Sequence, residues 1–269
     1  MALSQRKMLS IQIASAFLSI STLSIAYSII AYQSMVDYAL KQHPTFAFTP
    51  GAEFSLTRPT NGSDNSSAPP FRFVVIGDST SLGQGATKQT ENYSYQFAQA
   101  ALLNKYRSIE ITNLAVSGAK TEDVLAKQIE AALVLKPDLI VLSIGANDVT
   151  GLVSDTDFRR NYTNLLQRLT NSSAQVVLLN IPAFSTVPLL WQPYRSIADW
   201  RGRQFNQIVV ELVAGMAKNM PKIKIVDIYN RTEEEFRLYP DRNFAQDKYH
   251  PSSAGYSVWA KVIADSLSE

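Results

Sequence analysis

Ser79 and His250 are the residues of this sequence best suited to nucleophilic chemistry. Ser79 ends the run Gly-Asp-Ser at 77–79, directly after a short apolar segment, and such turn-forming residues can project a side chain beyond a strand. A serine hydroxyl becomes a good nucleophile only when a base accepts its proton. Because His43 lies near the apolar N-terminal segment, a histidine base in the globular region must be His250. Asp247 can accept the other ring N–H of that histidine and fix its tautomer.

Two further segments follow apolar runs and end in polar groups that suit acyl chemistry. Residues 114–118 read Leu-Ala-Val-Ser-Gly, and residues 145–148 read Gly-Ala-Asn-Asp. Together with 77–79 and with 247–251, which reads Asp-Lys-Tyr-His-Pro, they form four ordered blocks. In these blocks the chain resembles the SGNH/GDSL hydrolase superfamily, over roughly residues 71–265.

The resemblance implies a serine esterase or lipase with a defined set of site residues. It implies Ser79 as the nucleophile, His250 as the general base and acid, and Asp247 as the carboxylate that orients the histidine. It also implies three donors to the oxyanion of the tetrahedral intermediate, namely the backbone N–H groups of Ser79 and Gly118 and the side-chain amide of Asn147. Each of these positions carries a competent side chain or backbone group.

Substrate class and reaction type stay open within this resemblance. The family hydrolyses esters and thioesters of lipids, small alcohols and acetylated sugars, and some members transfer acyl groups instead. One alternative is therefore an acyltransferase that uses the same residues on envelope glycans. A second is a non-catalytic binding module with a retained hydrolase fold, which the competent residues at every proposed position disfavour.

Other polar residues near these blocks have less chemical meaning. Asp78 and Asp148 could form a carboxylate pair of the glycosidase type, but we interpret them as residues that order their loops through hydrogen bonds to nearby backbone. The run 83–85 (Gly-Gln-Gly) matches only part of a dinucleotide-binding fingerprint. The carboxylate spacing suggests no metal site, and the proposed chemistry needs neither metal nor cofactor.

The loop at 182–195 is the segment expected to influence specificity, since it follows the fourth predicted strand at the edge that carries the site. Its aromatic side chains could line an acyl or sugar pocket or pack against the body of the domain. The candidate substrate-binding residues are Phe184, Trp191, Tyr194 and Arg195.

Apolar runs alternate with segments of helical spacing from residue 71 onward. The expected strands are 71–76, 109–114, 138–144, 175–181 and 223–228. This alternation predicts an α/β fold, a three-layer α/β/α sandwich around a flavodoxin-like, five-stranded, mostly parallel sheet of order 2-1-3-4-5. In that order the second and third strands flank the first, so Gly118 and Asn147 should lie on either side of Ser79.

Composition excludes several classes of function. The chain has 269 residues, 46% of them hydrophobic, and a formal net charge of +2, which is too small to indicate a nucleic-acid surface. It contains no cysteine, so disulfides, thiol nucleophiles and thiolate metal sites are excluded.

The N-terminus predicts a membrane anchor. Arg6 and Lys7 precede an uncharged stretch long enough to cross a bilayer as a helix, and this basic flank predicts a cytoplasmic N-terminus with the rest of the chain outside. We expect an anchor at 1–36, a flexible linker at 37–70 and the catalytic domain at 71–269. The alternative is a signal peptide whose cleavage releases a secreted enzyme.

Overall fold

The computed structural model describes residues 2–42, 50–59, 68–216 and 223–268, and the chain divides into two compact units at 1–42 and 43–269. The first unit is one helix, α1 (Ala2–Gln42). Its segment Lys7–Tyr32, with a mean hydropathy of 1.8, is long and apolar enough to cross a membrane. A signal sequence near an N-terminus meets the same criterion, so the helix is compatible with both expectations for this region.

The second unit is built around a six-stranded sheet of order β1-β3-β2-β4-β5-β6. Its strands are β1 (Ala52–Thr57), β2 (Phe71–Gly77), β3 (Ser108–Asn113), β4 (Leu139–Ser143), β5 (Gln175–Leu179) and β6 (Ile223–Val226). β2 to β6 are parallel to one another, and β1 pairs antiparallel with β3. The five predicted strands and their relative order are therefore confirmed, and β1 adds a sixth strand at the edge.

β1 corrects the expectation of a flexible linker at 37–70. The strand alternates exposed and less exposed residues, and the Phe54 ring meets the Tyr95 ring edge-on with centroids 5.8 Å apart. Pairing with β3 and this contact stabilise a segment whose own sequence is too short and polar to stand out. The parts of the expected linker at 43–49 and 60–67 lie outside the described residues.

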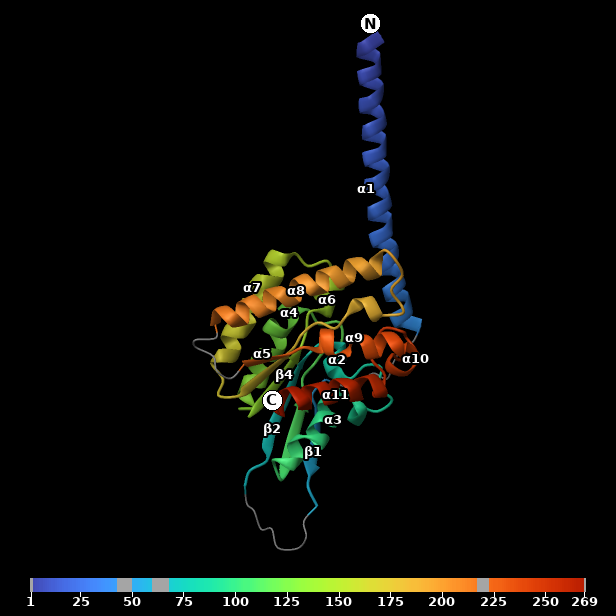
Figure 1. Ribbon diagram of the computed structural model, residues 1–269. Coiled ribbons are helices and arrows are strands. Elements are labelled where there is room, and N and C mark those ends of the chain that lie inside the picture. Colours follow the sequence, from blue (N-terminus) through green and yellow to red (C-terminus); the bar gives the residue numbers. More distant parts are fainter. Residues whose placement is uncertain (1, 43–49, 60–67, 217–222, 269) are drawn as a thin grey trace. The chain divides into compact units, whose positions relative to one another are not determined.

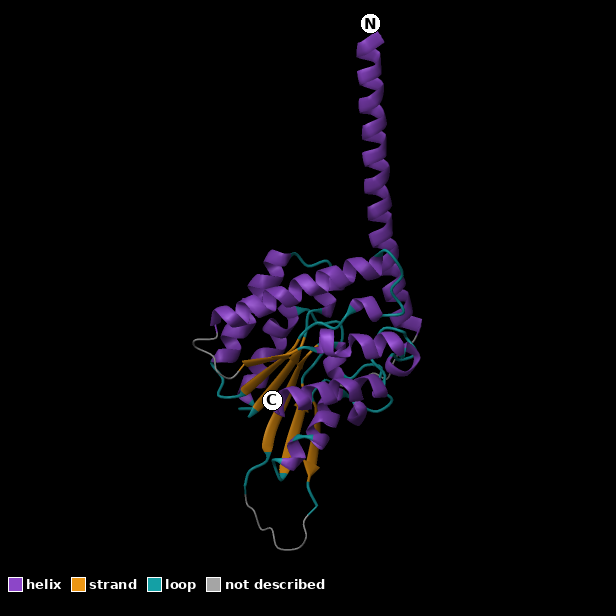
Figure 2. Cartoon of the chain, in the orientation of Figure 1, coloured by secondary structure: helices purple, strands orange, loops and turns teal. Residues whose placement is uncertain are grey.

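Helices cover both faces of the sheet (Figures 1 and 2). The helices of the second unit are α2 (Ser79–Leu82), α3 (Tyr93–Ala100), α4 (Thr121–Asp123), α5 (Ile129–Val134), α6 (Ala146–Thr150), α7 (Asp155–Thr170), α8 (Tyr194–Met216), α9 (Ile228–Leu238), α10 (Pro240–Asn243) and α11 (Ser253–Ser268). Short 3₁₀ turns occupy Gln89–Glu91, Leu102–Asn104 and Phe184–Thr186, and a π-helical turn occupies Val124–Gln128 between α4 and α5. The α/β/α sandwich predicted from the alternating pattern is confirmed.

The core lies on both faces of the central strands. All five residues of β4 are buried, as expected for a strand covered by helices on both sides. On one face Phe158 of α7 stacks on Phe205 of α8, with centroids 4.0 Å apart. On the other face, the ring centroid of Tyr93 in α3 lies 5.8 Å from that of Trp259 in α11.

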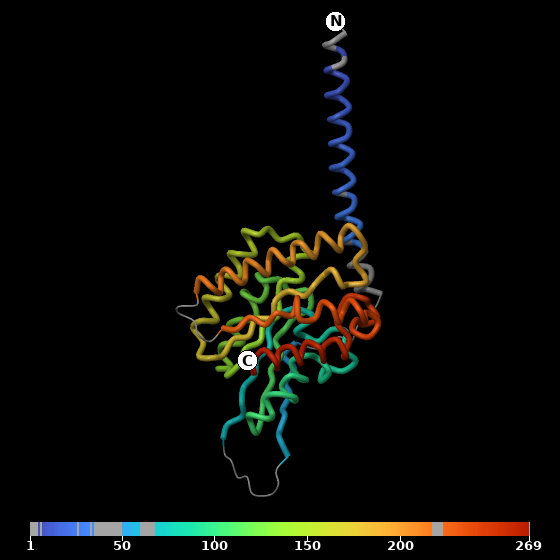
Figure 3. Tube along the Cα trace, viewed as in Figure 1, coloured from blue at the N-terminus to red at the C-terminus, as the bar shows by residue number. Residues whose placement is uncertain are grey.

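The parallel strands bring the segments that carry the sequence blocks to one edge. β2 lies between β3 and β4, so the carboxyl ends of these three parallel strands are neighbours, although helical segments separate them along the chain (Figure 3). Ligands bind at this edge in open α/β sheets. The fold therefore places the three loops that follow β2, β3 and β4 around a common point.

Candidate active site

Ser79 lies at the sharp turn between β2 and α2. Gly77 closes the strand with a φ of +142°, and a Cβ atom there would lie 2.0 Å from the carbonyl oxygen of Ser143, so only glycine fits. Asp78 caps the helix, since its Oδ1 accepts the Thr80 N–H at 2.9 Å and the Thr80 hydroxyl at 2.8 Å. Ser79 is thus the first helical residue, and its N–H needs no partner within the helix.

A buried glutamine that the sequence analysis missed holds the end of β2. Gln128 is 2% exposed, and its amide makes two bonds to Gly77, donating to the carbonyl at 2.9 Å and accepting from the N–H at 2.8 Å. It belongs to the π-helical turn between α4 and α5. π turns are frequent at functional sites, but helical spacing in the sequence does not reveal one, so no sequence signal pointed to Gln128.

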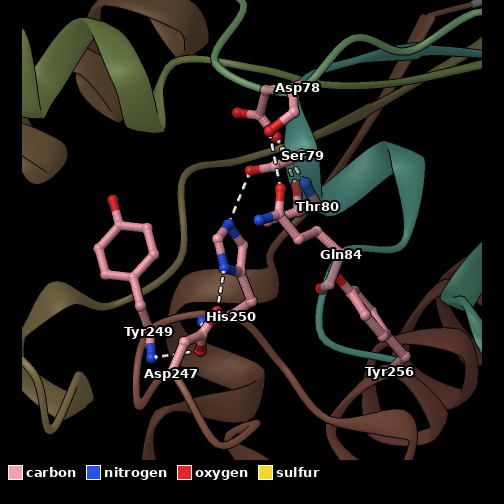
Figure 4. Close-up of polar contacts among 9 residues, drawn as sticks. Asp78, Ser79, Thr80, Gln84, Asp247, Tyr249, His250 and Tyr256 are labelled. Carbon is pink, nitrogen blue, oxygen red and sulfur yellow. Dashed lines mark hydrogen bonds and ion pairs between the residues drawn. The ribbon is translucent and has the colours of Figure 1, made fainter. Parts of the chain in front are cut away.

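Ser79, His250 and Asp247 form a hydrogen-bonded chain (Figure 4). The Ser79 Oγ lies 2.9 Å from His250 Nε2, and His250 Nδ1 lies 2.6 Å from Asp247 Oδ2. A carboxylate can only accept at Nδ1, so the proton lies on Nδ1 and Nε2 is left to accept the serine hydroxyl. The structure therefore brings together the three residues that the resemblance implied as nucleophile, base and orienting carboxylate.

Asp247 is held as an anion. Burial acts to raise the pKa of Asp247, but its hydrogen bond with His250, the charge of that histidine and two backbone N–H groups outweigh burial and hold the pKa below its usual value. These N–H groups, from Tyr249 and His250, donate to Asp247 Oδ1 at 2.9 and 3.0 Å. The carboxylate is 1% exposed and keeps a fixed orientation toward the imidazole.

The predicted oxyanion donors come from the loops after β3 and β4. Gly118 has a φ of +79°, and a Cβ there would meet nothing within 4 Å, so its backbone faces open space. Within the described part of the chain, the N–H groups of Ser79 and Gly118 have no hydrogen-bond partner. Asn147 lies in α6, and its Nδ2 donates one hydrogen to Ala119 O at 3.0 Å, which leaves the second for a substrate.

The two other aspartates order their loops, as we interpreted them. Asp78 bonds Thr80, and Asp148 accepts the Thr121 N–H at 3.0 Å and the Thr121 hydroxyl at 2.6 Å. Burial raises the pKa of Asp78 to about 6 and also raises the pKa of Asp148. No cluster of three or more His, Cys, Asp or Glu side chains that could hold a metal ion occurs among the described residues.

The four candidate substrate-binding residues lie in different environments. Phe184 is buried and lines a largely apolar cavity of about 40 Å³ that His250 also borders. Trp191 is 70% exposed, and Tyr194 is partly exposed at the start of α8. Arg195 donates from Nε to Leu190 O at 2.7 Å, so its guanidinium braces its own loop. Of the four, Phe184 is the one that the structure places beside the hydrogen-bonded chain.

The site also contains a polar residue that the sequence analysis set aside. Gln84 follows α2, its N–H donates to Ser79 O at 2.9 Å, and its Oε1 accepts the Ser117 hydroxyl at 2.7 Å. In the sequence, Gln84 stands out only as the middle residue of the incomplete glycine-rich fingerprint at 83–85. The feature of the sequence that could have pointed to a role in the site is its position only five residues after Ser79.

Comparison with known proteins gives concordant results. Residues 75–258 match the model of the GDSL-like lipase/acylhydrolase family. A GDSL-like esterase of Mycobacterium tuberculosis is 28% identical over 192 residues, which span 71% of this chain and 59% of that protein. The chain thus matches well under two thirds of the length of this relative.

Solved structures share the fold at low sequence identity. A lipase from a goat rumen metagenome aligns with a TM-score of 0.58 at 20% identity, covering 73% of this chain and 97% of the other. A variant of an acetyl xylan esterase from Geobacillus stearothermophilus aligns with a TM-score of 0.56 at 19% identity, covering 73% and 94%. Because the family model covers most of the second unit, including both Ser79 and His250, the chain belongs to the GDSL-like lipase/acylhydrolase family.

Proposed function

We propose that this chain is a serine esterase that hydrolyses carboxylic esters or thioesters of lipid or acetylated-sugar type through an acyl-enzyme intermediate. The observation that carries the proposal is the buried hydrogen-bonded chain from Ser79 Oγ through His250 to Asp247. A serine that is hydrogen-bonded to a histidine, which is itself hydrogen-bonded to an orienting carboxylate, has the arrangement required for nucleophilic acyl transfer. Family membership supports the reaction class.

The reaction begins with attack of Ser79 Oγ on the carbonyl carbon of the ester. The Ser79 proton moves to His250 Nε2 as the new C–O bond forms, and Asp247 stabilises the resulting imidazolium. Negative charge develops on the former carbonyl oxygen, within reach of the free N–H groups of Ser79 and Gly118 and the second hydrogen of Asn147.

The intermediate collapses when the bond to the leaving alcohol or thiol breaks and His250 returns its proton to that group. An acyl group is then esterified to Ser79. Water repeats the sequence, with His250 accepting a proton from water and returning it to Ser79 Oγ as the acid leaves. No other proton donor is needed in the cycle.

A panel of p-nitrophenyl esters of increasing chain length, together with acetylated glycans, tests this proposal on the full-length protein. We expect turnover of part of the panel and stoichiometric labelling of Ser79 by a fluorophosphonate, with Ser79→Ala inactive and unlabelled. Acyl transfer to an added sugar acceptor in preference to water would instead identify an acyltransferase with the same residues. Turnover that survives in Ser79→Ala would contradict the proposal.

We also propose that α1 anchors the enzyme in a membrane with the domain on the extracytoplasmic side. The supporting observations are the apolar segment Lys7–Tyr32 and the basic residues Arg6 and Lys7 at its N-terminal end. Protease added to intact cells should remove the domain, and the mature protein should retain its N-terminal helix. Protection of the domain until lysis would reverse the orientation, and an N-terminus near Ile29 would identify a cleaved signal peptide.

A further inference from the structure

The turn that carries Gly118 lacks the packing that fixes the rest of the site. Val116, Ser117 and Gly118 are all exposed, and a Cβ built on Gly118 would meet nothing within 4 Å. The flanking residues Ala115 and Ala119 are buried, but residues 116–118 have no core packing of their own to define where the Gly118 N–H points. Electrostatic stabilisation of an oxyanion nevertheless requires donors whose positions are set before the reaction begins. Polar contacts must supply that order.

One side-chain hydrogen bond joins the tip of this turn to the loop of the nucleophile. The Ser117 hydroxyl donates to Gln84 Oε1 at 2.7 Å. Among the described residues, no other side-chain hydrogen bond reaches 116–118. The ends of the turn are held by backbone bonds from Val116 N–H to Gly77 O and from Ala119 N–H to Val116 O, both 3.1 Å, and by the Asn147 amide, which donates to Ala119 O at 3.0 Å.

Gln84 is itself firmly placed beside the reacting groups. Its N–H donates to Ser79 O at 2.9 Å, and its carbonyl accepts the Tyr256 hydroxyl at 2.7 Å. The next residue, Gly85, packs so tightly that a Cβ there would lie 2.4 Å from Pro251 O and 2.9 Å from His250 Cβ. Figure 4 shows the Gln84 side chain extending from this loop into the site. The glutamine backbone is thus tied to the nucleophile segment, to α11 and to the histidine loop.

We propose that Gln84 is a positioning residue that holds the Ser117–Gly118 turn, so that the Gly118 N–H points at the developing oxyanion. This inference rests on the proposed esterase function, because it concerns a donor that matters only when the carbonyl oxygen becomes charged. Gln84 acts through Ser117 and requires no contact with the substrate. The bond couples Gly118 to Ser79, the two backbone donors of the site.

The variants Gln84→Leu and Ser117→Ala each remove this bond. We expect kcat to fall about 10- to 100-fold in each, less than the about 10²–10³-fold loss for deleting an oxyanion donor, because a loosened donor still reaches the substrate in part of the population. KM should change by less than about threefold, since the interaction strengthens only in the transition state. Ser117→Thr keeps the hydroxyl and should keep most of the wild-type kcat.

A double-mutant cycle tests whether the two residues act through each other. If they do, the variant with both substitutions has about the same kcat as the less active of the two single variants, because the shared bond is broken only once. Independent losses that multiply in the double variant would overturn the proposal. The proposal would also be overturned if Ser117→Thr lost as much kcat as Ser117→Ala.

Ser196→Ala is the matched control, because the Ser196 hydroxyl donates to Gln192 Oε1 at 2.8 Å in a chemically identical exposed pair away from the nucleophile loop. It should keep wild-type kcat. Rates are measured on the full-length enzyme per fluorophosphonate-labelled Ser79, beside a thermal melt, so loss of folded protein does not count as loss of kcat. Because Ser117 is exposed, Ser117→Ala should fold normally, and it tests the proposal alone if Gln84→Leu folds poorly.

Failure of this inference is distinguishable from failure of the proposed function. If Ser79→Ala stays active, the esterase mechanism itself is wrong. If Ser79→Ala is inactive while Gln84→Leu and Ser117→Ala both keep wild-type kcat, the mechanism stands and the positioning role of Gln84 is overturned.

Discussion

The two sides of Ser79 are built in opposite ways. On the side of proton transfer, Asp247 and His250 are 1% and 2% exposed. A hydrogen bond of 2.6 Å joins their side chains, and one of 2.9 Å joins His250 to Ser79. On the side proposed to bind the oxyanion, Ser117 and Gly118 are exposed, and a side-chain hydrogen bond from Ser117 to Gln84 holds the tip of the turn. The same site therefore combines a dry, packed half and an open, hydrogen-bonded half.

The chemistry of each half explains the difference. A carboxylate that must remain charged and an imidazole that must keep one tautomer benefit from fixed partners and from the exclusion of water. Oxyanion donors must instead stay free of protein acceptors until a substrate arrives, so they cannot be covered. Substitutions on the two sides should therefore differ in size and kind, and the predictions below follow that order.

His250→Ala should have the largest effect among the side chains around Ser79. Among the described residues, His250 is the only base that hydrogen-bonds Ser79 Oγ, so without the imidazole kcat should fall about 10⁵–10⁶-fold, close to the Ser79→Ala level. Steady-state rates and the rate of fluorophosphonate labelling at Ser79 measure the loss. A folded variant that keeps more than about one tenth of wild-type kcat would show that another base serves the serine.

Asp247→Asn should rank second, with kcat lower by about 10⁴-fold. The asparagine oxygen can still accept the N–H groups of Tyr249 and His250, so the loop should keep its shape and its melting temperature. Its amide would donate toward His250 Nδ1 and favour the wrong tautomer. A loss of less than about tenfold in kcat, with the fold intact, would reduce Asp247 to a structural residue of this loop.

Asn147→Ala tests the open half and should lower kcat about 10²–10³-fold with a smaller change in KM. Because Asn147 Nδ2 also donates to Ala119 O, a thermal melt must accompany the kinetics. A purely structural asparagine would lower the melting temperature and the active fraction, while folded molecules kept their turnover. A well-folded variant within threefold of wild type would remove Asn147 from the oxyanion site.

The packed half was the easier one to predict from sequence. Apolar runs that end in polar blocks predict strands and loops at one sheet edge, and Asp247 and His250 are close enough in the chain for their pairing to be local. The strand ends match within two residues. In α7 the residues Phe158, Tyr162, Leu165, Leu166 and Leu169 recur at helical spacing, which predicts one buried face, and all five are buried.

The contacts that sequence could not supply are those between distant polar residues. Gln128, in a π-helical turn, bonds Gly77 across 51 residues of chain, and Gln84 meets Ser117 because β2 and β3 are neighbours in the sheet. β1 was missed since its stability depends on pairing with β3. The orientation of Trp191 and Arg195 likewise depends on loop backbone that no residue pattern specifies.

Asp78→Asn should have the smallest effect on kcat, within about tenfold, because its carboxyl bonds Thr80 and leaves the Ser79 hydroxyl free. Its main effect should be on how the free energy of unfolding changes with pH. Burial raises the pKa of Asp78 to about 6 in the folded protein, from 3.8. Between these values the folded state binds more protons than the unfolded state, so the free energy of unfolding falls as pH rises from about 4 to about 6.

Asparagine keeps the acceptor for Thr80 but cannot ionise, so Asp78→Asn should lack this fall. The gain in unfolding free energy over wild type should grow between pH 4 and pH 7, by up to about 3 kcal/mol at about 1.4 kcal/mol per pKa unit. Denaturant titrations of the full-length protein at several pH values measure it. Asp157, whose pKa the Ser154 hydroxyl and Arg160 hold below its usual value, provides a control in which Asp157→Asn changes stability in the opposite direction. A difference between Asp78→Asn and wild type that stays constant with pH would show that Asp78 titrates normally, and that the dry half of the site does not extend to the cap of α2.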